Sequence, residues 1–246
     1  MLTINYINIA NIDHEIYHFF KKSVSRPRQQ KADQYRFFDD AKRCILSELL
    51  LQYSYYQKIG TTPEINIEYN EFGKPFIQGK NNFSFNISHS GKWVVIAYGD
   101  VPVGVDIEKV CSKEEQMPIE AFTREERAYI NGVVNEDRAK RFTQTWTLKE
   151  SYVKYIGTGL STDLNSFSIV IEDTIKVKKR NGVEEKIKLE CRLLEADYYL
   201  STCSSENKIS MNEIKLIDLI DFAHNKNCKL DEPVVMNKDA LGLEIR

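Results

Sequence analysis

The sequence predicts an α+β protein of two similar units that join near residue 102. Each half of the 246-residue chain contains one long helical pattern and several short strand-like segments. The chain is 42% hydrophobic and 28% charged, which is ordinary for a soluble globular protein and argues against disorder. The two halves share no letter-by-letter repeat, so the prediction depends on the order of the elements.

The first half combines an N-terminal strand, helices and a group of strands. Its strongest pattern is the helix at 40–60, where apolar residues form one stripe and Gly60 is a plausible stop. Glycine and proline divide the later apolar segments into short strands. The predicted elements are a strand at 2–9, short helices at 13–22 and 28–40, the helix at 40–60, a strand and a Gly-Lys-Pro turn within 64–77, and three strands within 84–108 separated at 88–92 and 99–102.

The second half opens with an irregular acidic loop, followed by two helices and then strands. Thr123 with Glu126 three residues later resembles a capping box, which predicts a helix start. We divide the chain into units 1–102 and 103–222 and a tail at 223–246 without clear periodicity. The predicted elements are a loop at 109–118, a helix from Thr123, a helix at 136–156 that ends at Gly-Thr-Gly, and strands at 166–172, 174–180, 185–195, 198–204 and 213–220, with a tight hairpin turn at Asn181-Gly182.

Composition excludes several classes of protein. The net charge of −2 and the pI near 6.2 provide no basic field for nucleic acid, so nucleic acid is not an expected partner. No apolar stretch approaches the length of a membrane span, and the N-terminus does not resemble a signal peptide, so no membrane partner is expected. The five cysteines are scattered and odd in number, which indicates reduced thiols and a cytoplasmic protein.

Two acids end an apolar strand in the segment Gly-Val-Asp-Ile-Glu. Asp106 and Glu108 alternate along the strand and so share a face, with Cα atoms about 7 Å apart. Like charges this close favour a cation between them, and oxygen ligands suit Mg²⁺. The alternative is that the strand simply ends and the acids are solvated. Gly104 in the same strand often marks close approach of a ligand or of backbone.

Glu150 and Lys154 form a second candidate pair. They lie four residues apart on the predicted helix at 136–156 and therefore share a face. A surface salt bridge is the ordinary explanation for such a pair. The aromatic neighbours Trp146 and Tyr152 indicate that part of this helix is buried, which makes an exposed pair a weaker explanation.

Small polar residues surround a glycine turn in "NISHSGKW", and these form the third candidate. Asn86, Ser88, His89, Ser90 and Lys92, with exposed backbone N–H groups, would make a phosphate cradle. A plain polar turn is the alternative. A fourth group is the basic cluster near the start of the long first-half helix, for which a solvated helix face is the default. Its members are Arg26, Arg28, Lys31, Arg36, Lys42 and Arg43, with Lys74 further on beside a turn.

Three motifs in this order and spacing resemble the 4′-phosphopantetheinyl transferases of the long, surfactin type. They are "FNISHSGKWVVIAYGDVPVGVDIEK", "FTREE" and "WTLKESYVKYIGTGLS", the last with the pattern Trp-x-x-Lys-Glu-Ser-x-x-Lys at 146–154. Weaker similarity extends through "DDAKRCILSELL" and "EFGKPFI", so that the resemblance covers roughly residues 20–220. It implies two α+β subdomains related by a pseudo-two-fold axis, with coenzyme A in the cleft between them.

The resemblance also implies an activity. Such enzymes transfer the 4′-phosphopantetheine arm of coenzyme A to a serine of an apo acyl or peptidyl carrier protein and release adenosine 3′,5′-bisphosphate. Magnesium is the implied cofactor, and an internal pseudo-dimer implies a monomer. The chain does not indicate whether the carrier serves fatty acid synthesis or nonribosomal peptide or polyketide synthesis, although the long single-chain form favours secondary metabolism, such as antibiotic biosynthesis.

The resemblance assigns roles to individual residues. Glu150 is the implied base for the serine proton, with Glu108 as the alternative, and Glu126 would reach the metal through water. The implied metal ligands are Asp106, Glu108 and Glu150; the implied pyrophosphate contacts are Lys154, His89 and Ser88; the 3′-phosphate contacts are Arg28, Lys31 and Arg43; and the adenine contacts are Gly73, Lys74 and Pro75.

Two other functions use the same residues. A Mg²⁺-dependent nucleotide phosphohydrolase would use water in place of serine, and a non-catalytic module would bind coenzyme A or carrier proteins without turnover. Apolar contacts to a carrier protein could come from the segment with Met117, Pro118, Ile119 and Phe122. The alternative is that these side chains pack inside the protein.

Overall fold

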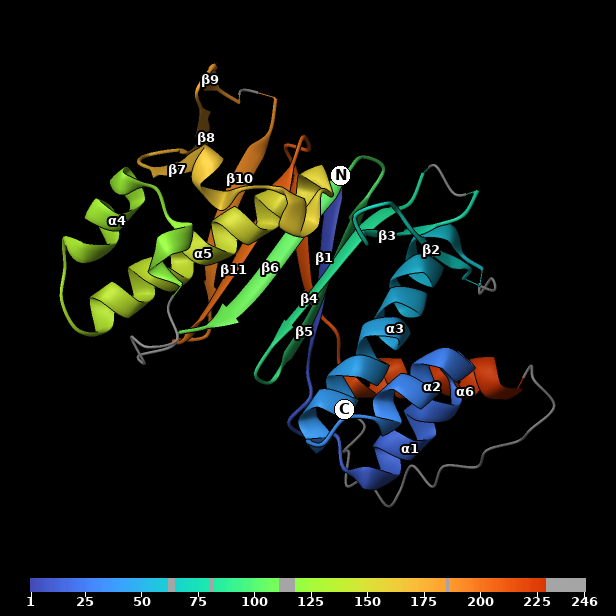
Figure 1. Ribbon diagram of the computed structural model, residues 1–246. Helices are drawn as coiled ribbons and strands as arrows, with labels where there is room; N and C mark the ends of the chain where they lie inside the picture. The colour runs from blue at the N-terminus through green and yellow to red at the C-terminus, as the bar shows by residue number, and fades with distance from the viewer. Residues whose placement is uncertain (62–64, 80–81, 111–117, 185, 229–246) are drawn as a thin grey trace.

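The computed structural model contains two sheet-and-helix units placed side by side (Figure 1). It describes residues 1–61, 65–79, 82–110, 118–184 and 186–228. The helices are α1 His14–Lys22, α2 Arg26–Asp33, α3 Phe38–Ile59, α4 Arg124–Asn131, α5 Glu136–Ile156 and α6 Leu216–Cys228, with 3₁₀ turns at Ile119–Ala121, Gly159–Ser161 and Leu164–Ser166. The strands are β1 Leu2–Asn8, β2 Ile67–Tyr69, β3 Pro75–Ile77, β4 Ser84–Ser90, β5 Trp93–Gly99, β6 Val103–Lys109, β7 Phe167–Ile171, β8 Ile175–Lys179, β9 Gly182–Val183, β10 Lys188–Leu194, β11 Tyr198–Ser204 and β12 Ile209–Glu213.

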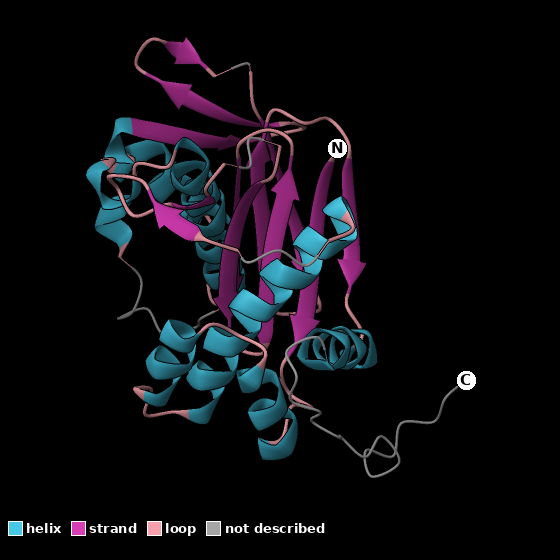
Figure 2. Cartoon of the chain, turned by 90° about the vertical axis from the view of Figure 1, so that its right-hand side faces the viewer, coloured by secondary structure: helices cyan, strands magenta, loops and turns pink. Residues whose placement is uncertain are grey.

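The two units share one topology. Three antiparallel strands in the first unit have the order β1-β5-β4, and three in the second have the corresponding order β6-β11-β10; β12 adds to the first sheet beside β1. Each sheet carries one long helix, α3 in the first unit and α5 in the second. Figure 2, turned toward the side of α3, shows a long helix lying across the strands. The predicted α+β architecture of two similar units is therefore confirmed, and its repeat lies in topology.

Strand β5 lies between two cores, because all of its residues are buried. Val94 and Ile96 belong to the core that α3 covers. Val95 and Ala97 point the other way, into a second core that includes Val105 of β6. This burial on both faces explains why the strand is an uninterrupted apolar run in the sequence.

The helices follow from local signals. Asp13 caps α1 through a side-chain bond to the Ile16 N–H, and α5 ends at Gly157 in the left-handed conformation, as the Gly-Thr-Gly signal predicted. The Thr123 capping box is confirmed, since both of its bonds with Glu126 are present. The second predicted short helix, at 28–40, is α2, which ends already at Asp33 and has a proline in its first turn.

The C-terminal segment differs from the sequence prediction. Residues 213–220 were expected to be a strand, but α6 begins at Leu216 and continues through residues 223–228, which were assigned to an aperiodic tail. Its buried residues Leu219, Ile220 and Ala223 follow helical spacing. Strand β12 precedes it and pairs in parallel with β1. Residues 209–228 lie in the second half by sequence, and they extend the sheet and the core of the first unit.

The predicted hairpin near Asn181 is shorter than expected. Lys179 pairs with Gly182, so the turn residues are Arg180 and Asn181, and the return strand β9 has two residues. Strand β10 pairs with β11 instead. The predicted division at residue 102 stays a prediction, and most of the acidic loop at 109–118 lies outside the described residues.

Candidate functional site

The two acids of β6 face helix α5. Val103, Val105 and Ile107 of this strand point into the core between the sheets, so Gly104, Asp106 and Glu108 lie on the opposite face. A Cβ atom on Gly104 would lie 1.9 Å from the Ser151 carbonyl oxygen, which places α5 directly against the strand at this glycine. Gly104 predicted the close approach of a ligand or of backbone, and in the structure it is the backbone of α5 that lies close to it.

We expect Gly104→Ala to destabilise the protein by about 1–3 kcal/mol, because the new methyl group has no room. Its neighbours would be backbone atoms of Ser151 and Tyr155, which cannot move aside as a flexible side chain does. Urea unfolding measures the loss. Gly99→Ala is the matched control, since a Cβ there would meet its nearest atom at an ordinary 3.5 Å. Equal stability of the two variants would show that the crossing tolerates a side chain.

Asp106 lies at the centre of a group of polar side chains, Ser88, Glu108, Glu150 and Lys154, that we call the Asp106 cluster. Lys154 Nζ lies 2.6 Å from Asp106 Oδ1, and Ser88 Oγ donates to the same oxygen at 2.8 Å. The residue is only 3% exposed, so a solvated strand end does not explain it. Its other oxygen, Oδ2, is buried without a hydrogen-bond partner among the described residues. A buried carboxylate oxygen in this state is costly unless a ligand completes it.

Glu108 and Glu150 belong to the same electrostatic cluster. Burial, and then the negative charge of Asp106, raise the pKa of Glu108 to about 7, and Glu150 adds to the effect. Burial followed by the charge of Asp106 also raises the pKa of Glu150, which Lys154 partly opposes. The three acids therefore repel one another across the β6–α5 crossing. A cation there would relieve this repulsion.

The donor chemistry fits Mg²⁺, but the three acids do not enclose an ion by themselves. In the part of the chain that the structure describes, no group of three acidic, histidine or cysteine side chains is placed to hold a metal. Mg²⁺ in proteins commonly takes one or two carboxylates and completes its shell with phosphate oxygens and water. The unpartnered Oδ2 of Asp106 is the oxygen best suited to such a role.

The predicted turn at 88–92 is wrong in extent. Ser88, His89 and Ser90 are the last residues of β4 and pair with β5, so their backbone belongs to a sheet and does not form an open cradle. The turn consists of Gly91 and Lys92 alone. His89 lies near positive charge: desolvation of its ring, and then the charge of Arg43 with a contribution from Lys154, lower its pKa.

Two of the three predicted 3′-phosphate contacts line one cavity. Arg28 and Lys31 of α2 border a cavity of about 330 Å³ that Glu48 and Tyr69 also line. The guanidinium of Arg28 lies 3.3 Å from the buried Glu48 carboxylate, which orients it. Arg43 lies elsewhere: it pairs with Asp40 and donates to the carbonyl of Gly91, beside the end of β4.

The predicted adenine contacts lie on the β2–β3 hairpin. Gly73 has a positive φ of 85° in the turn, and Pro75 begins β3. Lys74 donates to the carbonyl oxygens of Tyr155 at 3.0 Å and Val103 at 3.2 Å, so it joins the first unit to the end of α5. Burial lowers its pKa to about 8. Lys74 and Pro75 both line a cavity of about 270 Å³.

The lowered pKa of Lys74 predicts a pH dependence of stability. The folded pKa of about 8 lies below the ordinary 10.5, so between these values the unfolded chain binds more protons and the free energy of unfolding rises with pH. Lys74→Met lacks this titration. Urea unfolding at pH 7.5 and pH 10 should show that the free energy of unfolding of the wild type, relative to that of the variant, is larger at pH 10. An unchanged difference would contradict the buried ammonium.

Glu126 and Lys149 form a buried ion pair that the sequence did not predict. Lys149 Nζ lies 2.8 Å from both carboxylate oxygens of Glu126, which also accept from the N–H groups of Thr123 and Ile169. The predicted water-mediated contact of Glu126 with the metal is unsupported, because both oxygens are occupied. The capping-box pattern identified Glu126 in the sequence, but no pattern indicated that Lys149 is its partner.

The apolar side chains considered as contacts to a carrier protein differ in burial. Phe122 is fully buried against Phe142 and Trp146. Ile119 packs partly buried against the same cluster, while Pro118 is exposed and Met117 lies outside the described residues. Phe122 therefore does not provide a surface for a carrier protein.

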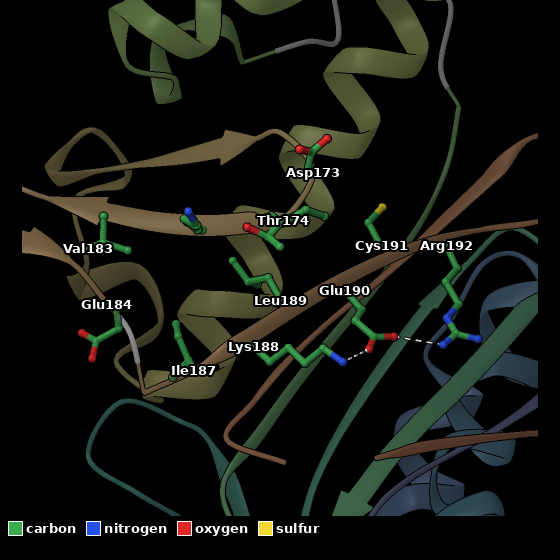
Figure 3. Close-up of a pocket in the computed structure, with 12 residues that line it drawn as sticks. Asp173, Thr174, Val183, Glu184, Ile187, Lys188, Leu189, Glu190, Cys191 and Arg192 are labelled. Atoms are coloured by element: carbon green, nitrogen blue, oxygen red, sulfur yellow. Dashed lines mark hydrogen bonds and ion pairs between the residues drawn. The ribbon is translucent and has the colours of Figure 1, made fainter. Parts of the chain in front are cut away.

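A further cavity of about 600 Å³ lies between β10 and the β8–β9 hairpin (Figure 3). None of the predicted site residues lines it. At one edge Glu190 pairs with both Lys188 and Arg192, as the dashed lines in Figure 3 show.

No helix in the described ranges has the length and hydropathy of a membrane span.

Family comparisons match most of the chain. The model of the 4′-phosphopantetheinyl transferase superfamily matches residues 102–203. The model of the N-terminal part of 4′-phosphopantetheinyl transferase matches residues 12–100. The first segment contains β6, α5, β10 and all but the last residue of β11 of the second unit, and the second contains α3, β4 and β5 of the first.

Individual relatives carry the same description. The 4′-phosphopantetheinyl transferase gsp of Aneurinibacillus migulanus is 31% identical over 239 residues, which cover 92% of this chain and 100% of the relative. A 4′-phosphopantetheinyl transferase of Bacillus subtilis is 30% identical over 188 residues, covering 74% of this chain and 83% of the relative. Among solved structures, a holo-(acyl-carrier-protein) synthase from Bacillus anthracis in complex with coenzyme A is 16% identical, covers 42% of this chain and 93% of its own, and gives a TM-score of 0.36.

Proposed function

The chain belongs to the 4′-phosphopantetheinyl transferase superfamily and is a transferase, and we propose that it uses the Asp106 cluster to move the 4′-phosphopantetheine arm of coenzyme A to a carrier-protein serine. The main support for this site is that two motifs far apart in the sequence are in contact in the structure. Asp106 of β6 and Lys154 of α5 are joined by a 2.6 Å ion pair beside a buried oxygen that has no partner among the described residues.

In this proposal the acids hold Mg²⁺. Asp106, Glu108 and Glu150 would supply the protein ligands, and the ion would neutralise charge on the coenzyme A pyrophosphate when bound. Lys154 is well placed to exchange Asp106 for a phosphate oxygen, because its ammonium already lies at the cluster. His89 lies at the same end of β4 and is the further pyrophosphate contact that we propose. The neighbouring Ser88 directs its hydroxyl proton to Asp106.

The chemical step needs a base and a leaving group. The serine hydroxyl gives its proton to a carboxylate, and its oxygen bonds to the phosphorus that carries the arm. The bond from that phosphorus to the bridging oxygen breaks, and adenosine 3′,5′-bisphosphate leaves with the electron pair. Glu150 is the proposed base and Glu108 the alternative, because both carboxylates lie at the cluster beside Asp106 and Lys154.

The nucleotide portion of coenzyme A is assigned to the basic residues of the first unit. Arg28 and Lys31 would hold the 3′-phosphate in their shared cavity, and the Gly73–Pro75 turn would border the adenine. Arg43, which pairs with Asp40 beside the end of β4, does not line that cavity and is left out of this assignment. Arg28 is oriented by Glu48 and offers its remaining donors to an anion.

Arg28→Ala tests the 3′-phosphate assignment. We expect KM for coenzyme A to rise by about 10-fold or more, since a charge-assisted hydrogen bond is worth about 1.5–3 kcal/mol. With 3′-dephospho-coenzyme A as substrate, the variant and the wild type should have equal KM values. Steady-state kinetics with both substrates makes the comparison. Equal losses with the two substrates would remove Arg28 from the 3′-phosphate site.

The carrier protein and the cellular setting complete the proposal. The acceptor is an apo acyl or peptidyl carrier protein, and we place the reaction in the cytoplasm with the chain acting as a monomer. The free thiols of Cys44, Cys191 and Cys203 agree with a reducing compartment. Because the chain has the long single-chain form, we propose that the carrier belongs to secondary metabolism.

Incubation with coenzyme A, Mg²⁺ and an apo carrier protein tests the proposed activity. Intact-mass spectrometry should show the carrier gaining one phosphopantetheinyl group on serine. Release of phosphopantetheine without carrier modification would indicate a phosphohydrolase. Binding of coenzyme A without any turnover would indicate a non-catalytic module. Either of the last two results contradicts the transfer.

A further inference from the structure

Two serines of β4 hold the two acids of β6 in the same way. Ser88 Oγ donates to Asp106 Oδ1 at 2.8 Å and accepts from the Ile107 N–H at 3.3 Å. Ser90 Oγ donates to Glu108 Oε2 at 2.7 Å and accepts from the Lys109 N–H at 3.2 Å. Each serine therefore joins one carboxylate to the N–H of the next residue, and the unit repeats two residues along both strands.

These contacts belong to a seam between the two sheets. Strands β4 and β6 belong to different sheets, yet they lie against each other. Asn86 Oδ1 accepts from the Val105 N–H at 2.9 Å and continues the series of Ser88 and Ser90 by one step. Side-chain oxygens thus take the place that backbone carbonyls have in a sheet, and Asn86 does so without touching either acid.

The hydrogen-bond chemistry fixes the direction of each serine proton. A hydroxyl has one proton, and an oxygen that accepts from a backbone N–H directs that proton elsewhere. In both cases it points to the acid, which it orients by one oxygen. For Asp106 the result is that Oδ1 is held by Ser88 and Lys154 while Oδ2 stays buried and unpartnered among the described residues.

We propose that Ser88 and Ser90 are positioning residues that hold Asp106 and Glu108 in the orientation required to bind a divalent cation. The proposal rests on the proposed function, in which these acids are metal ligands. It assigns Ser90 a role toward an acid that the sequence did not suggest. It gives Ser88, whose only proton is directed to Asp106, the same role in place of contact with phosphate. Removing a residue that orients a metal ligand typically lowers metal affinity by 10–100-fold.

Mn²⁺ affinity tests the proposal independently of turnover. Mn²⁺ is titrated into the full chain in the presence of coenzyme A, and the free ion is followed by electron paramagnetic resonance. Ser90→Ala should weaken binding by about 10-fold or more, while Ser90→Thr, which keeps the hydroxyl, should lose less than that. Ser88→Ala repeats the test at Asp106, so that one variant decides if the other fails to fold.

Asn86→Ala is the matched control, because it removes a seam hydrogen bond but no contact to an acid. It should bind Mn²⁺ nearly as the wild type does. Wild-type affinity in Ser90→Ala and Ser88→Ala would overturn the proposal, and so would an equal loss in Asn86→Ala, which would indicate general loosening of the seam. A wild type that transfers the arm but binds no Mn²⁺ would overturn both this inference and the metal site. A wild type that binds Mn²⁺ without transferring the arm would contradict the proposed function alone, and the variant affinities would still decide the role of the serines.

Discussion

Asp106→Asn should lower kcat/KM for arm transfer by at least about 10²–10³-fold while the protein stays folded, an effect of the size seen when one charge-stabilising group is lost. Asparagine has nearly the same shape, but it removes the negative charge that Lys154 contacts and that a cation would require. The assay is carrier modification followed over time, and thermal unfolding checks the fold.

Asp100→Asn is the matched control for this variant. Asp100 lies in the turn just before β6, is exposed, and pairs with Lys58 on the surface. Its substitution should leave transfer unchanged, because exposed ion pairs contribute little. A nearly normal rate in Asp106→Asn would remove Asp106 from the catalytic centre.

Lys149→Ala should reduce the free energy of unfolding by about 3–5 kcal/mol, because it leaves a buried carboxylate without its counter-charge. The side chains of Lys149 and Glu126 are 0% and 1% exposed, so water cannot replace the lost ammonium. The pair also joins α4 and α5 to β7 through the carbonyl of Phe167 and the N–H of Ile169. Urea unfolding at pH 7 measures the effect.

The control for this prediction is Lys140→Ala on the surface of α5. Lys140 lies 3.7 Å from Asp137, and both side chains are exposed, so about 0–1 kcal/mol is expected. If Lys149→Ala costs no more than this control, the buried pair does not stabilise the second unit as described.

Local pattern predicted the acidic strand well. The alternation of Val105, Asp106, Ile107 and Glu108 placed both acids on one face, and burial of the apolar residues in the inter-sheet core fixed which face that is. The spacing of Glu150 and Lys154 on α5 likewise placed them together. What the pattern could not supply is the distance between the two elements, which depends on Gly104 allowing α5 to reach the strand.

Tertiary contacts explain the parts that were not predicted. Strand β12 is short and largely polar, and it becomes a strand only by pairing with β1, two hundred residues earlier in the chain. Ser88 and Ser90 look like turn residues by type, yet they are strand residues whose hydroxyls replace backbone acceptors for β6. Lys149 is paired with Glu126 only because α4 packs on α5.

A crystal structure with coenzyme A and Mn²⁺ would test the metal site, since the metal can be located by its anomalous signal. We predict one strong anomalous peak, with Asp106 and an oxygen of the coenzyme A pyrophosphate as ligands of the metal and Lys154 on a phosphate oxygen. A pyrophosphate bound away from β6 and α5, or a metal without Asp106 as a ligand, would contradict it.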